Sequence, residues 1–549
     1  MMNRIKEYFA NLIGYFRPSL KTRKKQLAKL RDSWGKESSR GRKYDLVSIL
    51  HDLNAEAAGK EMVDDRTWKD LDMDEVFAKI DRCVGAVGSQ YLYRLLRIYE
   101  TNKEILKERS RQYDLFRKDN NLRESLQLPL LHLEHENASF IAHLIYGVLP
   151  SKSRLDYLIY LSSFGSIASL AGLFFFNQML ISVILFALLN IVIHDLYSRK
   201  IYKYFAGLSF LNTMLGLAVK LSSVKTDHDL QQICYLKKNK TVALDLKKKI
   251  GWLVMDKSRL SELMDMLVEY LNLICLFDII AFIRSMEHLK RHRSELAGIF
   301  EAIGSLDASL AVASYLEGLN YFTAPHINPD RRIDVAGIYH PLLDYPVANS
   351  FRLEDKSALV TGSNMAGKTT FIKTVGVNLI LARTLHICLA ERADLPESIV
   401  RSSIERSDEL AGGKSSFFVE VETLSGFIRL ADNGKKYLFL IDEIYRGTNT
   451  VERIASSAAV LNYLGHKHQI LVTTHDVELQ ELLKGIYNMY HFSEKVDGSN
   501  YYFDYKLSPG PCRSRNAIKL LKLRGYPESV TTAADLLAKE LSIKFDNAG

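Results

Sequence analysis

A glycine-rich segment at 361–370, TGSNMAGKTT, is the clearest chemical feature of this sequence. The β-prone run Ala358-Leu359-Val360 precedes it, and the helical run FIKTVGVNLILARTL follows it. The order G-x-x-x-x-G-K-T between a strand and a helix is typical of a loop whose backbone N–H groups cradle phosphate oxygens. The expected phosphate-binding residues are Gly362, Ser363, Asn364, Met365, Ala366, Gly367, Lys368, Thr369 and Thr370.

Two side chains of this loop carry the chemistry of a nucleoside triphosphate site. Lys368 would reach the β- and γ-phosphates, and the Thr369 hydroxyl would bind Mg²⁺. The glycines allow the tight backbone curl, and the N-terminal end of the following helix favours an anion. The loop therefore predicts ATP and Mg²⁺ as cofactors.

A second motif supplies carboxylates for the same site. The continuous apolar run YLFLI at 437–441 is typical of a buried parallel strand, and Asp442 and Glu443 follow it directly. Asp442 suits the Mg²⁺ shell, whereas Glu443 suits a catalytic base that polarises the attacking water. The alternative interpretation is an acidic pair that only caps the end of a strand.

A third strand is expected at 469–473 (QILVT), followed by Thr474, His475 and Asp476. A histidine at the carboxyl end of a parallel strand lies on the ligand-binding edge of such a sheet. His475 is therefore expected to act with the catalytic residues and to sense the γ-phosphate.

In this combination the motifs resemble those of the MutS family of DNA mismatch repair ATPases, which belong to the ABC class. The matching segments are TGSNMAGKTT (361–370), SSFFVEVETL (415–424), LIDEIYRGTNT (440–450) and TTHD (473–476). NAIKLLKLRGYPESVTTAADLL (516–537) is similar to the C-terminal dimerisation helices of that family. The resemblance covers about 336–540, and 66–96 resembles the start of the family's helical core.

The resemblance implies an α/β P-loop ATPase domain of ABC type at the C-terminus, preceded by a mainly helical, core- and lever-like region. Two ATPase domains would pair head to tail across composite sites, so the chain is expected to act as a homodimer. By position, Ser415 would contact the γ-phosphate bound by the partner subunit. His340 and Val347 would lie near the adenine.

The sequence also departs from the family in ways that concern DNA. Mismatch-reading members open with a DNA-reading domain that carries a Phe-x-Glu wedge, whereas about 60 residues precede the core-like stretch here. The Phe-x-Glu occurrences at 418–420 and 492–494 lie inside the ATPase domain, and no room for a nuclease domain is expected after 540. Mismatch recognition is therefore not implied, although ATPase chemistry is.

An uncharged stretch interrupts the helical region. From Tyr157 to Ile193, 37 residues contain no Asp, Glu, Lys, Arg or His, and Asn177-Gln178 divides the stretch. A transmembrane helix needs about 20 apolar residues, so two short spans joined by a tight turn are expected. Basic residues on both flanks would hold both ends in the cytoplasm: Lys152, Arg154, Arg199, Lys200 and Lys203. A buried hairpin in a soluble core is the alternative, and the uncharged segment 205–219 is expected to be a core or interfacial helix.

The net charge of +9 is concentrated at the N-terminus. Residues 1–43 hold thirteen basic and three acidic side chains, and the other 506 residues sum to about −1. An amphipathic pattern from Ile5 to Phe16 leads into the basic run KTRKKQLAKLR at 21–31. This segment predicts docking to an anionic inner leaflet, with a solvated helix face and DNA phosphate binding as alternatives.

The ordinary composition, with 47% hydrophobic and 25% charged residues, excludes a mainly disordered or disulfide-scaffold chain. Five widely spaced cysteines indicate neither disulfides nor zinc, and no cleavable signal peptide is expected. The expected parts are a basic amphipathic segment (1–60), a helical core-like region (61–150), a transmembrane hairpin (151–200), a helical core and lever-like region (201–335), and the ATPase domain with dimerisation helices (336–549).

The leading functional hypothesis is a dimeric, MutS-like ATPase that is tethered to the cytoplasmic membrane and switches a helical clamp on DNA. Basic residues of the helical region that could meet phosphates are Lys237, Lys238, Lys240, Lys247, Lys248, Lys249, Lys290, Arg291 and Arg293. One alternative is a membrane ATPase that acts on a protein or lipid partner without DNA. Another is a soluble, cytoplasmic repair ATPase with a buried hairpin.

Overall fold

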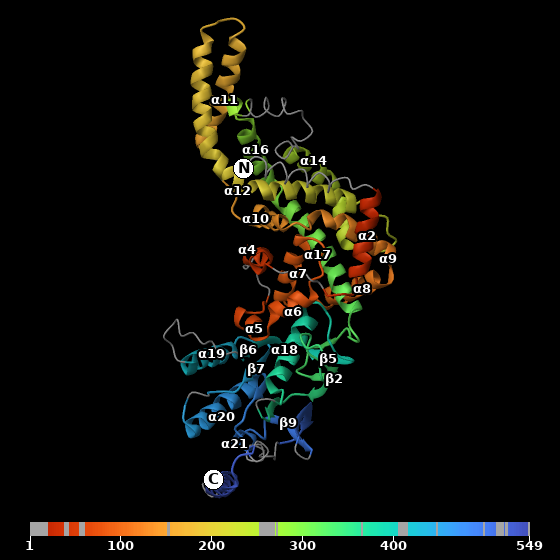
Figure 1. Ribbon diagram of the computed structural model, residues 1–549, viewed down its shortest axis with the longest axis vertical. Coiled ribbons are helices and arrows are strands. Elements are labelled where there is room, and N and C mark those ends of the chain that lie inside the picture. The colour runs from red at the N-terminus through yellow and green to blue at the C-terminus, as the bar shows by residue number, and fades with distance from the viewer. Residues whose placement is uncertain are drawn as a thin grey trace. The chain divides into compact units, whose positions relative to one another are not determined.

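The chain divides into two compact units (Figure 1). A computed structural model describes residues 20–37, 43–53, 61–150, 154–251, 270, 273–363, 366–404, 416–445, 448–497, 500–511, 521 and 525–546. Unit 1 comprises Met1–Gly59, Phe77–Leu95 and Arg111–Leu319. Unit 2 comprises Lys60–Val76, Leu96–Ser110 and Asn320–Gly549. Each unit has its own hydrophobic core.

Unit 1 is helical throughout its described residues. Its helices, whole or in part, are α2 (Leu20–Ser33), α3 (Tyr44–Val47), α4 (Ile49–Leu53), α6 (Met73–Ile80), α7 (Ala86–Arg97), α8 (Lys103–Lys118), α9 (Asn120–Leu130), η1 (Leu131–Leu133), η2 (Glu136–Phe140), α10 (Ile141–Tyr146), α11 (Arg154–Gly172), α12 (Met179–Leu221), α13 (Gln231–Lys238), α14 (Lys240–Gly251), α16 (Phe277–Arg291) and α17 (Arg293–Glu317). The helix-rich N-terminal region predicted from the sequence is thus confirmed.

Helix α17 forms the centre of unit 1 and carries a buried carboxylate. Asp307 accepts hydrogen bonds from the backbone N–H groups of Val84 (3.0 Å) and Gly85 (2.8 Å), just before α7 begins. A carboxylate at a helix N-terminus satisfies amides that have no partner inside the helix. A Cβ atom at Gly88 would lie 2.2 Å from Asp307 Oδ2, so only glycine leaves room for this contact.

Helices α11 and α12 form a hairpin that extends away from the rest of unit 1 (Figure 1). The two helices pack closely at Gly165. A Cβ atom there would lie only 2.4 Å from the Phe186 ring, so glycine permits this contact. Helix α12 continues without a break for 43 residues, a length of about 65 Å at 1.5 Å per residue. Its second part is buried in the unit's core, as expected for 205–219, from Leu208 to Leu221.

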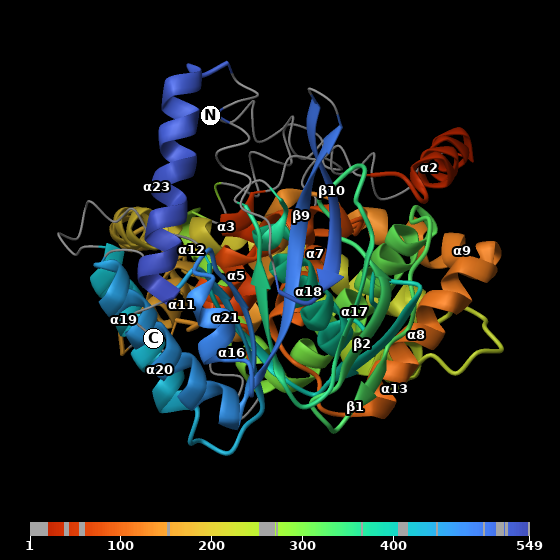
Figure 2. The same cartoon turned by 90° about the horizontal axis from the view of Figure 1, so that it is seen from below.

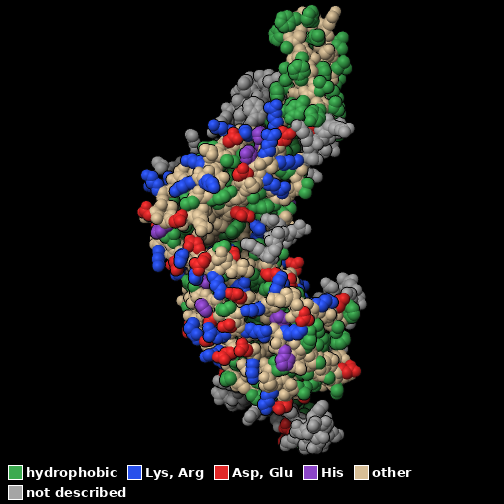
Figure 3. Space-filling view, turned by 180° about the vertical axis from the view of Figure 1, so that it is seen from behind, with side chains coloured by type: hydrophobic (Ala, Val, Ile, Leu, Met, Phe, Trp, Pro, Cys, Tyr) green, Lys and Arg blue, Asp and Glu red, His purple; other side chains and the backbone are tan. Residues whose placement is uncertain are grey.

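Two helical stretches in the described part of the chain are long and apolar enough to cross a membrane. One is the first part of α12, Met179–Tyr197, of which 6% is buried, and the other is α17, of which 78% is buried as a core helix. Helix α11 carries four serines among its apolar residues. Hydrophobic side chains cover the outer part of the hairpin, and no charged side chain lies among them (Figure 3).

Unit 2 is a mixed α/β structure with two sheets. The six-stranded sheet has the order β10-β9-β4-β8-β7-β6, and the four-stranded sheet has the order β1-β5-β2-β3. The strands are β1 (His326–Asn328), β2 (Ile333–Ile338), β3 (Asn349–Leu353), β4 (Ser357–Thr361), β5 (Arg392–Pro396), β6 (Ile399–Ser403), β7 (Tyr437–Asp442), β8 (Gln469–Thr473), β9 (Tyr487–Asp497) and β10 (Asn500–Pro509). This confirms the α/β region that the sequence predicts at the C-terminus.

The parallel strands bring the sequence motifs to one edge of the large sheet. β4 pairs in parallel with both β8 and β9, and β8 also pairs with β7. In the β7–β8 pair, Asp442 lies opposite Thr473. The carboxyl ends of such strands form the ligand-binding edge of an open α/β sheet.

The helices of unit 2 surround these sheets. They are α5 (Asp65–Asp70), α18 (Lys368–Thr384), α19 (Ser416–Leu430), α20 (Thr450–Lys467), α21 (Glu478–Leu482) and α23 (Glu528–Asp546), with parts of α6, α7 and α8. Figure 2 shows β9 and β10 as a long two-stranded ribbon. The Phe371 ring of α18 packs edge-on against Phe351 of β3 and Phe492 of β9.

Candidate functional site

The segment between β4 and α18 makes a sharp turn that depends on two glycines. Every residue of β4 is buried, and the strand ends at Thr361. Gly362 has φ +138°, and a Cβ atom there would lie 2.7 Å from the Phe492 carbonyl oxygen. Gly367 has φ +98° and precedes the first helical residue of α18. Both backbone angles lie in a region that side chains with a Cβ rarely adopt.

Lys368 lies across this turn. Its side chain is almost fully buried, and Nζ donates to the carbonyl oxygens of Gly362 (2.6 Å) and Ser363 (3.0 Å). The Ser363 hydroxyl is buried and has no hydrogen-bond partner within the described residues. The ammonium group therefore sits at the place where a phosphate would meet the loop. Asn364 and Met365, which complete the predicted loop, lie outside the described residues.

An oxygen-rich cluster lies beside the lysine. The Thr369 hydroxyl donates to Asp442 Oδ2 at 2.9 Å, and the Thr473 hydroxyl donates to Asp442 Oδ1. One carboxylate and one threonine hydroxyl are hard oxygen ligands of the kind that Mg²⁺ takes while it keeps several waters. The donor set of one carboxylate and one hydroxyl therefore fits Mg²⁺.

Glu443 occupies a strained position next to Asp442. Its φ is +54°, its backbone N–H donates to the Thr473 carbonyl (3.1 Å), and its side chain is mostly buried. A non-glycine residue with positive φ costs about 1 kcal/mol or more and persists where the surroundings fix it. The turn re-aims the carboxylate, so that Glu443 Oε1 lies 2.9 Å from His475 Nε2.

The same nitrogen of His475 also lies 3.1 Å from Lys368 Nζ. A neutral imidazole nitrogen either accepts from the ammonium or donates to the carboxylate, and it cannot do both at once. The tautomer of His475 therefore decides whether Lys368 or Glu443 is its partner. The structure thus brings together five residues that the sequence selected from three motifs: Lys368, Thr369, Asp442, Glu443 and His475.

Two further interactions at this edge of the sheet are not indicated by any of the sequence motifs. Thr473 binds the second oxygen of Asp442, as described above. Arg453 forms a two-pronged ion pair with Asp476 (3.0 and 2.7 Å), which fixes the segment that carries His475. The pairing of β7 with β8 could have indicated Thr473, but Arg453 lies 23 residues from its partner and gives no local signal.

The predicted adenine residues His340 and Val347 lie in the segment between β2 and β3. Val347 is half-exposed, whereas His340 is buried and its Nε2 has no hydrogen-bond partner within the described residues. Burial and, secondarily, the charge of Lys373 lower the pKa of His340 to about 4, although Asp72 opposes the shift. His340 is therefore neutral at physiological pH.

Tyr505 of β10 is an aromatic residue beside the loop that the sequence did not indicate. A Cβ atom at Gly367 would lie 3.3 Å from its ring, and its own φ is +54°. Its carbonyl oxygen accepts from Asn349 Nδ2 (3.0 Å), just after Val347. The two-stranded ribbon therefore joins the predicted adenine region to the phosphate loop.

The predicted contact residue Ser415 lies outside the described residues. Helix α19, which follows it, is anchored on α5 and β6. Arg66 donates to the Thr423 hydroxyl, and Asp70 accepts from the Ser402 hydroxyl (2.7 Å) and the Ile404 N–H (2.9 Å). The Arg66–Thr423 contact ties the end of the SSFFVEVETL motif to α5, and the Asp70 contacts join α5 to β6.

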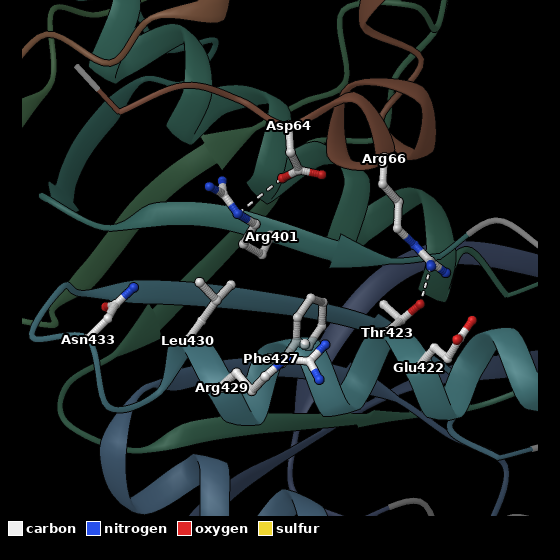
Figure 4. Close-up of a pocket in the computed structure, with 10 residues that line it drawn as sticks. Asp64, Arg66, Arg401, Glu422, Thr423, Phe427, Arg429, Leu430 and Asn433 are labelled. Atoms are coloured by element: carbon white, nitrogen blue, oxygen red, sulfur yellow. Dashed lines mark hydrogen bonds and ion pairs between the residues drawn. The ribbon is translucent and has the colours of Figure 1, made fainter. Parts of the chain in front are cut away.

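An open hollow of about 590 Å³ lies beside this anchor (Figure 4). It is lined by Asp64, Arg66, Arg401, Glu422, Thr423, Gly426, Phe427, Arg429, Leu430 and Asn433. Arg401 and Arg66 point toward partners within the hollow's own rim, Asp64 (3.1 Å) and Thr423. No residue of the phosphate loop lines it, so it is separate from the site described above.

The C-terminal region is similar to one family of known proteins. Residues 358–542 match the model of MutS domain V. The "DNA mismatch repair protein MutS" of Methanosarcina mazei is 32% identical over 276 residues, which are 47% of this chain and 30% of that protein. The proteins of the same name from Lactobacillus acidophilus and Thermotoga maritima are each 30% identical over 47% and 45% of this chain, and over 32% of their own lengths.

The chain spans about a third of the length of these relatives. The matched region contains β4, the glycine turn, Asp442, Glu443 and His475, which are the residues that converge at the sheet edge. The C-terminal part of the chain, residues 358–542, is therefore similar to domain V of the MutS family.

Proposed function

We propose that the chain is a P-loop ATPase of ABC type that works as a homodimer, is tethered to the cytoplasmic membrane and switches its helical unit on DNA. The observation that carries the proposal is the convergence of Lys368, Thr369, Asp442, Glu443 and His475 at one sheet edge. The MutS domain V match over the same residues supports it. The DNA part of the proposal rests on the names of the relatives, which are DNA mismatch repair proteins.

Each residue has a role in ATP hydrolysis under this proposal. The loop amides from Gly362 to Thr370 hold the phosphates, and Lys368 neutralises the charge of the β- and γ-phosphates. Thr369 and Asp442 would hold Mg²⁺, which would supply charge neutralisation at the phosphates. These positions fit the oxygen cluster that the two side chains already form.

Glu443 orients and polarises the attacking water, and His475 senses whether the γ-phosphate is bound. When Lys368 turns toward the phosphates it leaves His475 Nε2, and the imidazole can then donate to Glu443, 2.9 Å away. That hydrogen bond fixes the carboxylate in the position it needs as a base. Ser415 from the partner subunit would complete the site, which makes hydrolysis depend on the dimer.

The membrane tether rests on the α11–α12 hairpin. The first part of α12 is apolar and only 6% buried, so in water it would expose a large continuous apolar surface. Its position between cationic flanks favours a cytoplasmic ATPase unit. Within the basic run, Lys29 and Arg31 pair with Glu134 and Glu124 of unit 1, and this pairing reduces the charge that remains for a lipid or DNA partner.

The DNA part of the proposal is tested by the ATPase rate of the purified full chain with duplex, mismatched and branched DNA at several salt concentrations. Stimulation by one DNA structure, with binding that weakens as salt rises, is expected. If no DNA stimulates the ATPase and none binds in a salt-dependent manner, the DNA role is wrong.

A second candidate function is a membrane ATPase that acts on a protein or lipid partner without DNA. One observation favours it: α12 runs unbroken from the exposed hairpin into the core of unit 1, so movement of the core would move the hairpin as well. Purification from membranes distinguishes the two candidates. A stoichiometric protein partner without nucleic acid would favour this second function.

A further inference from the structure

Residues 44–549 are nearly neutral in sum, but two of their segments carry a strong local excess of positive charge. Residues 237–251 carry six lysines and one aspartate, and residues 284–293 carry four cationic side chains and one glutamate. These segments form α13 to α14 and the end of α16, all in unit 1. We call the exposed cations of α14 and the α16 end the basic shoulder, which consists of Lys247, Lys248, Lys249, Lys290 and Arg291.

Helix α14 packs along the second part of α12 and exposes its lysines. Ala243, Leu246 and Ile250 are buried in this contact. Lys240 Nζ donates to the Ser223 hydroxyl (3.3 Å), whereas Gly251 at the other end lies beside Asn212. The two helices are therefore antiparallel, and Figure 1 shows α14 on the side of α12 toward which the hairpin extends. Lys247 reaches back over Gly216, and Lys248 and Lys249 face outward.

The end of α16 places its cations directly at the foot of the hairpin. Lys290 Nζ donates to the Pro150 carbonyl (2.7 Å), four residues before α11 begins. Arg293 donates to the Gly147 carbonyl (2.9 Å), and the neighbouring Val148 is 96% exposed. Lys290 and Arg293 therefore hold the segment that leads into α11, and the exposed Val148 lies in the same segment.

The cations of the two helices converge. The pKa of His288 is lowered first by burial and then by the positive charges of Lys249 and Arg291, so side chains of α14 and α16 act on one imidazole. Burial and then the charge of Lys247 likewise lower the pKa of Lys220. Asp245, on α14 itself, already pairs with Lys249 (2.7 Å). Figure 3 shows Lys and Arg side chains gathered below the apolar hairpin.

We propose that the basic shoulder binds the headgroups of anionic lipids around the inserted hairpin. This inference rests on the membrane tether of the proposed function and adds the lipid class that the tether selects. A bilayer that holds the hairpin places its headgroup layer near Pro150, whose carbonyl Lys290 already contacts. At physiological salt the potential of anionic headgroups extends over about one Debye length and so acts on cations near that layer. Duplex DNA would have to share that layer with lipid phosphates of the same charge, so lipid is the favoured partner.

The test measures how fast lysines of the full chain are acylated after reconstitution in vesicles. One set of vesicles contains only neutral phosphatidylcholine, and the other contains the same lipid with anionic phosphatidylglycerol at about 30 mol%. Mass spectrometry follows each lysine. We expect Lys247, Lys248 and Lys290 to react about fivefold more slowly in the anionic vesicles, and the difference to disappear at high salt. The exposed Lys69 and Lys118 are internal controls whose rates stay equal.

A charge-reversed variant checks the same inference by a second measurement. Lys247→Glu with Lys248→Glu should retain flotation with both vesicle types but copurify less anionic lipid in polymer nanodiscs. The control variant, Lys69→Glu with Lys118→Glu, changes the net charge by the same amount at positions outside the basic shoulder. It should copurify as much anionic lipid as the natural chain.

Three outcomes would overturn the inference in distinguishable ways. Equal acylation rates in both vesicles, with normal flotation, would remove the lipid-binding shoulder and leave the tether intact. Protection of the same lysines by duplex DNA in detergent, without protection by anionic vesicles, would assign the surface to DNA. Failure of the chain to float with either vesicle type would overturn the tether and the shoulder together.

Discussion

Glu443 is the residue on which hydrolysis, as distinct from nucleotide binding, depends in our proposal. Glu443→Gln keeps the shape of the side chain but removes its ability to accept a proton. We expect ATP binding to persist while turnover falls by about 10²–10⁴-fold, as for other lost general bases. Nucleotide binding and steady-state ATPase assays measure the two effects, and light scattering would detect an accumulated ATP-bound dimer. Normal turnover in this variant would show that the role given to Glu443 is wrong.

Two variants provide controls for this experiment. Lys368→Ala removes the cation that faces the phosphates and should weaken ATP binding itself. Glu481→Gln changes an exposed carboxylate that pairs with Lys484 (3.6 Å) on the surface of the same unit. It should leave both binding and turnover unchanged.

Thr473 tests the Mg²⁺ assignment without touching a predicted ligand. Thr473→Val keeps the volume and the buried strand position but removes the hydroxyl that donates to Asp442. Asp442 then loses one of the two donors that orient it, so half-maximal ATPase activity should need several-fold more Mg²⁺. ATP binding without Mg²⁺ should not change. An unchanged Mg²⁺ titration would contradict the link between Thr473 and the metal.

His340 predicts a pH dependence of stability. Its pKa falls from the ordinary value of 6.5 to about 4 in the folded chain, so the unfolded chain binds more protons between these values. Stability is therefore complete above about pH 6.5 and decreases as pH falls toward 4, by on the order of 3 kcal/mol in full. Thermal midpoints of His340→Gln should fall less steeply between pH 7 and 5 than those of the natural chain. His466→Gln, at an exposed position, should keep the natural slope.

At the scale of an element, Asp307 connects α17 to the start of α7. Asp307→Ala would leave the buried amides of Val84 and Gly85 without partners, which should destabilise unit 1 by about 2–3 kcal/mol. A chain of two units need not unfold in one step, so amide hydrogen exchange at Val84 and Gly85 is the appropriate measurement. Asp114→Ala, on the exposed face of α8, should leave that exchange unchanged.

The elements of the nucleotide site were predictable because their signals are local. A strand, a glycine turn and a helix follow one another from Ser357 to Thr384, and two apolar runs that each end in polar residues place Asp442 and His475. Parallel pairing then brings the strand ends together without further information. The contacts of Arg453 and Tyr505 could not be predicted, since they depend on tertiary packing between segments far apart in the chain.

Neither the length of α12 nor the chain segments that make up unit 2 could be predicted from local sequence patterns. The charges at Arg199 and Lys200 end an apolar run, yet charged residues do not break a helix, and α12 continues through them to Leu221. Residues 60–76 and 96–110 look like the helical region that surrounds them in the sequence. Their place in unit 2 depends on contacts such as the Val400 N–H donating to the Tyr99 hydroxyl (3.1 Å), which no local pattern encodes.

Inside the hairpin, Asn190 joins three segments through buried hydrogen bonds. It accepts from the Ser162 hydroxyl (2.6 Å) and donates to the Ser166 hydroxyl (2.7 Å) and to the Ile274 carbonyl. Such bonds are expected to contribute about 0.6–2 kcal/mol each in an apolar environment. Asn190→Leu should therefore loosen the contact of residues 273–276 with the hairpin, while the hairpin itself stays apolar. Hydrogen exchange at Cys275 and Leu276 would increase, while Asn177→Leu at the hairpin turn would have no such effect.

At the scale of the whole molecule, the tether predicts how the chain leaves the cell membrane. An inserted hairpin with some 37 uncharged residues should resist high salt and alkaline carbonate and require detergent for extraction, because the apolar surface cannot be transferred to water. Leu185→Lys with Leu188→Lys places two charges on exposed positions of α12 and should make the chain extractable by carbonate. Lys118→Leu, a substitution on the exposed face of α8, should not alter extraction. Release of the natural chain by salt alone would show that α11 and α12 lie on, or away from, the membrane, and the proposed tether would be wrong.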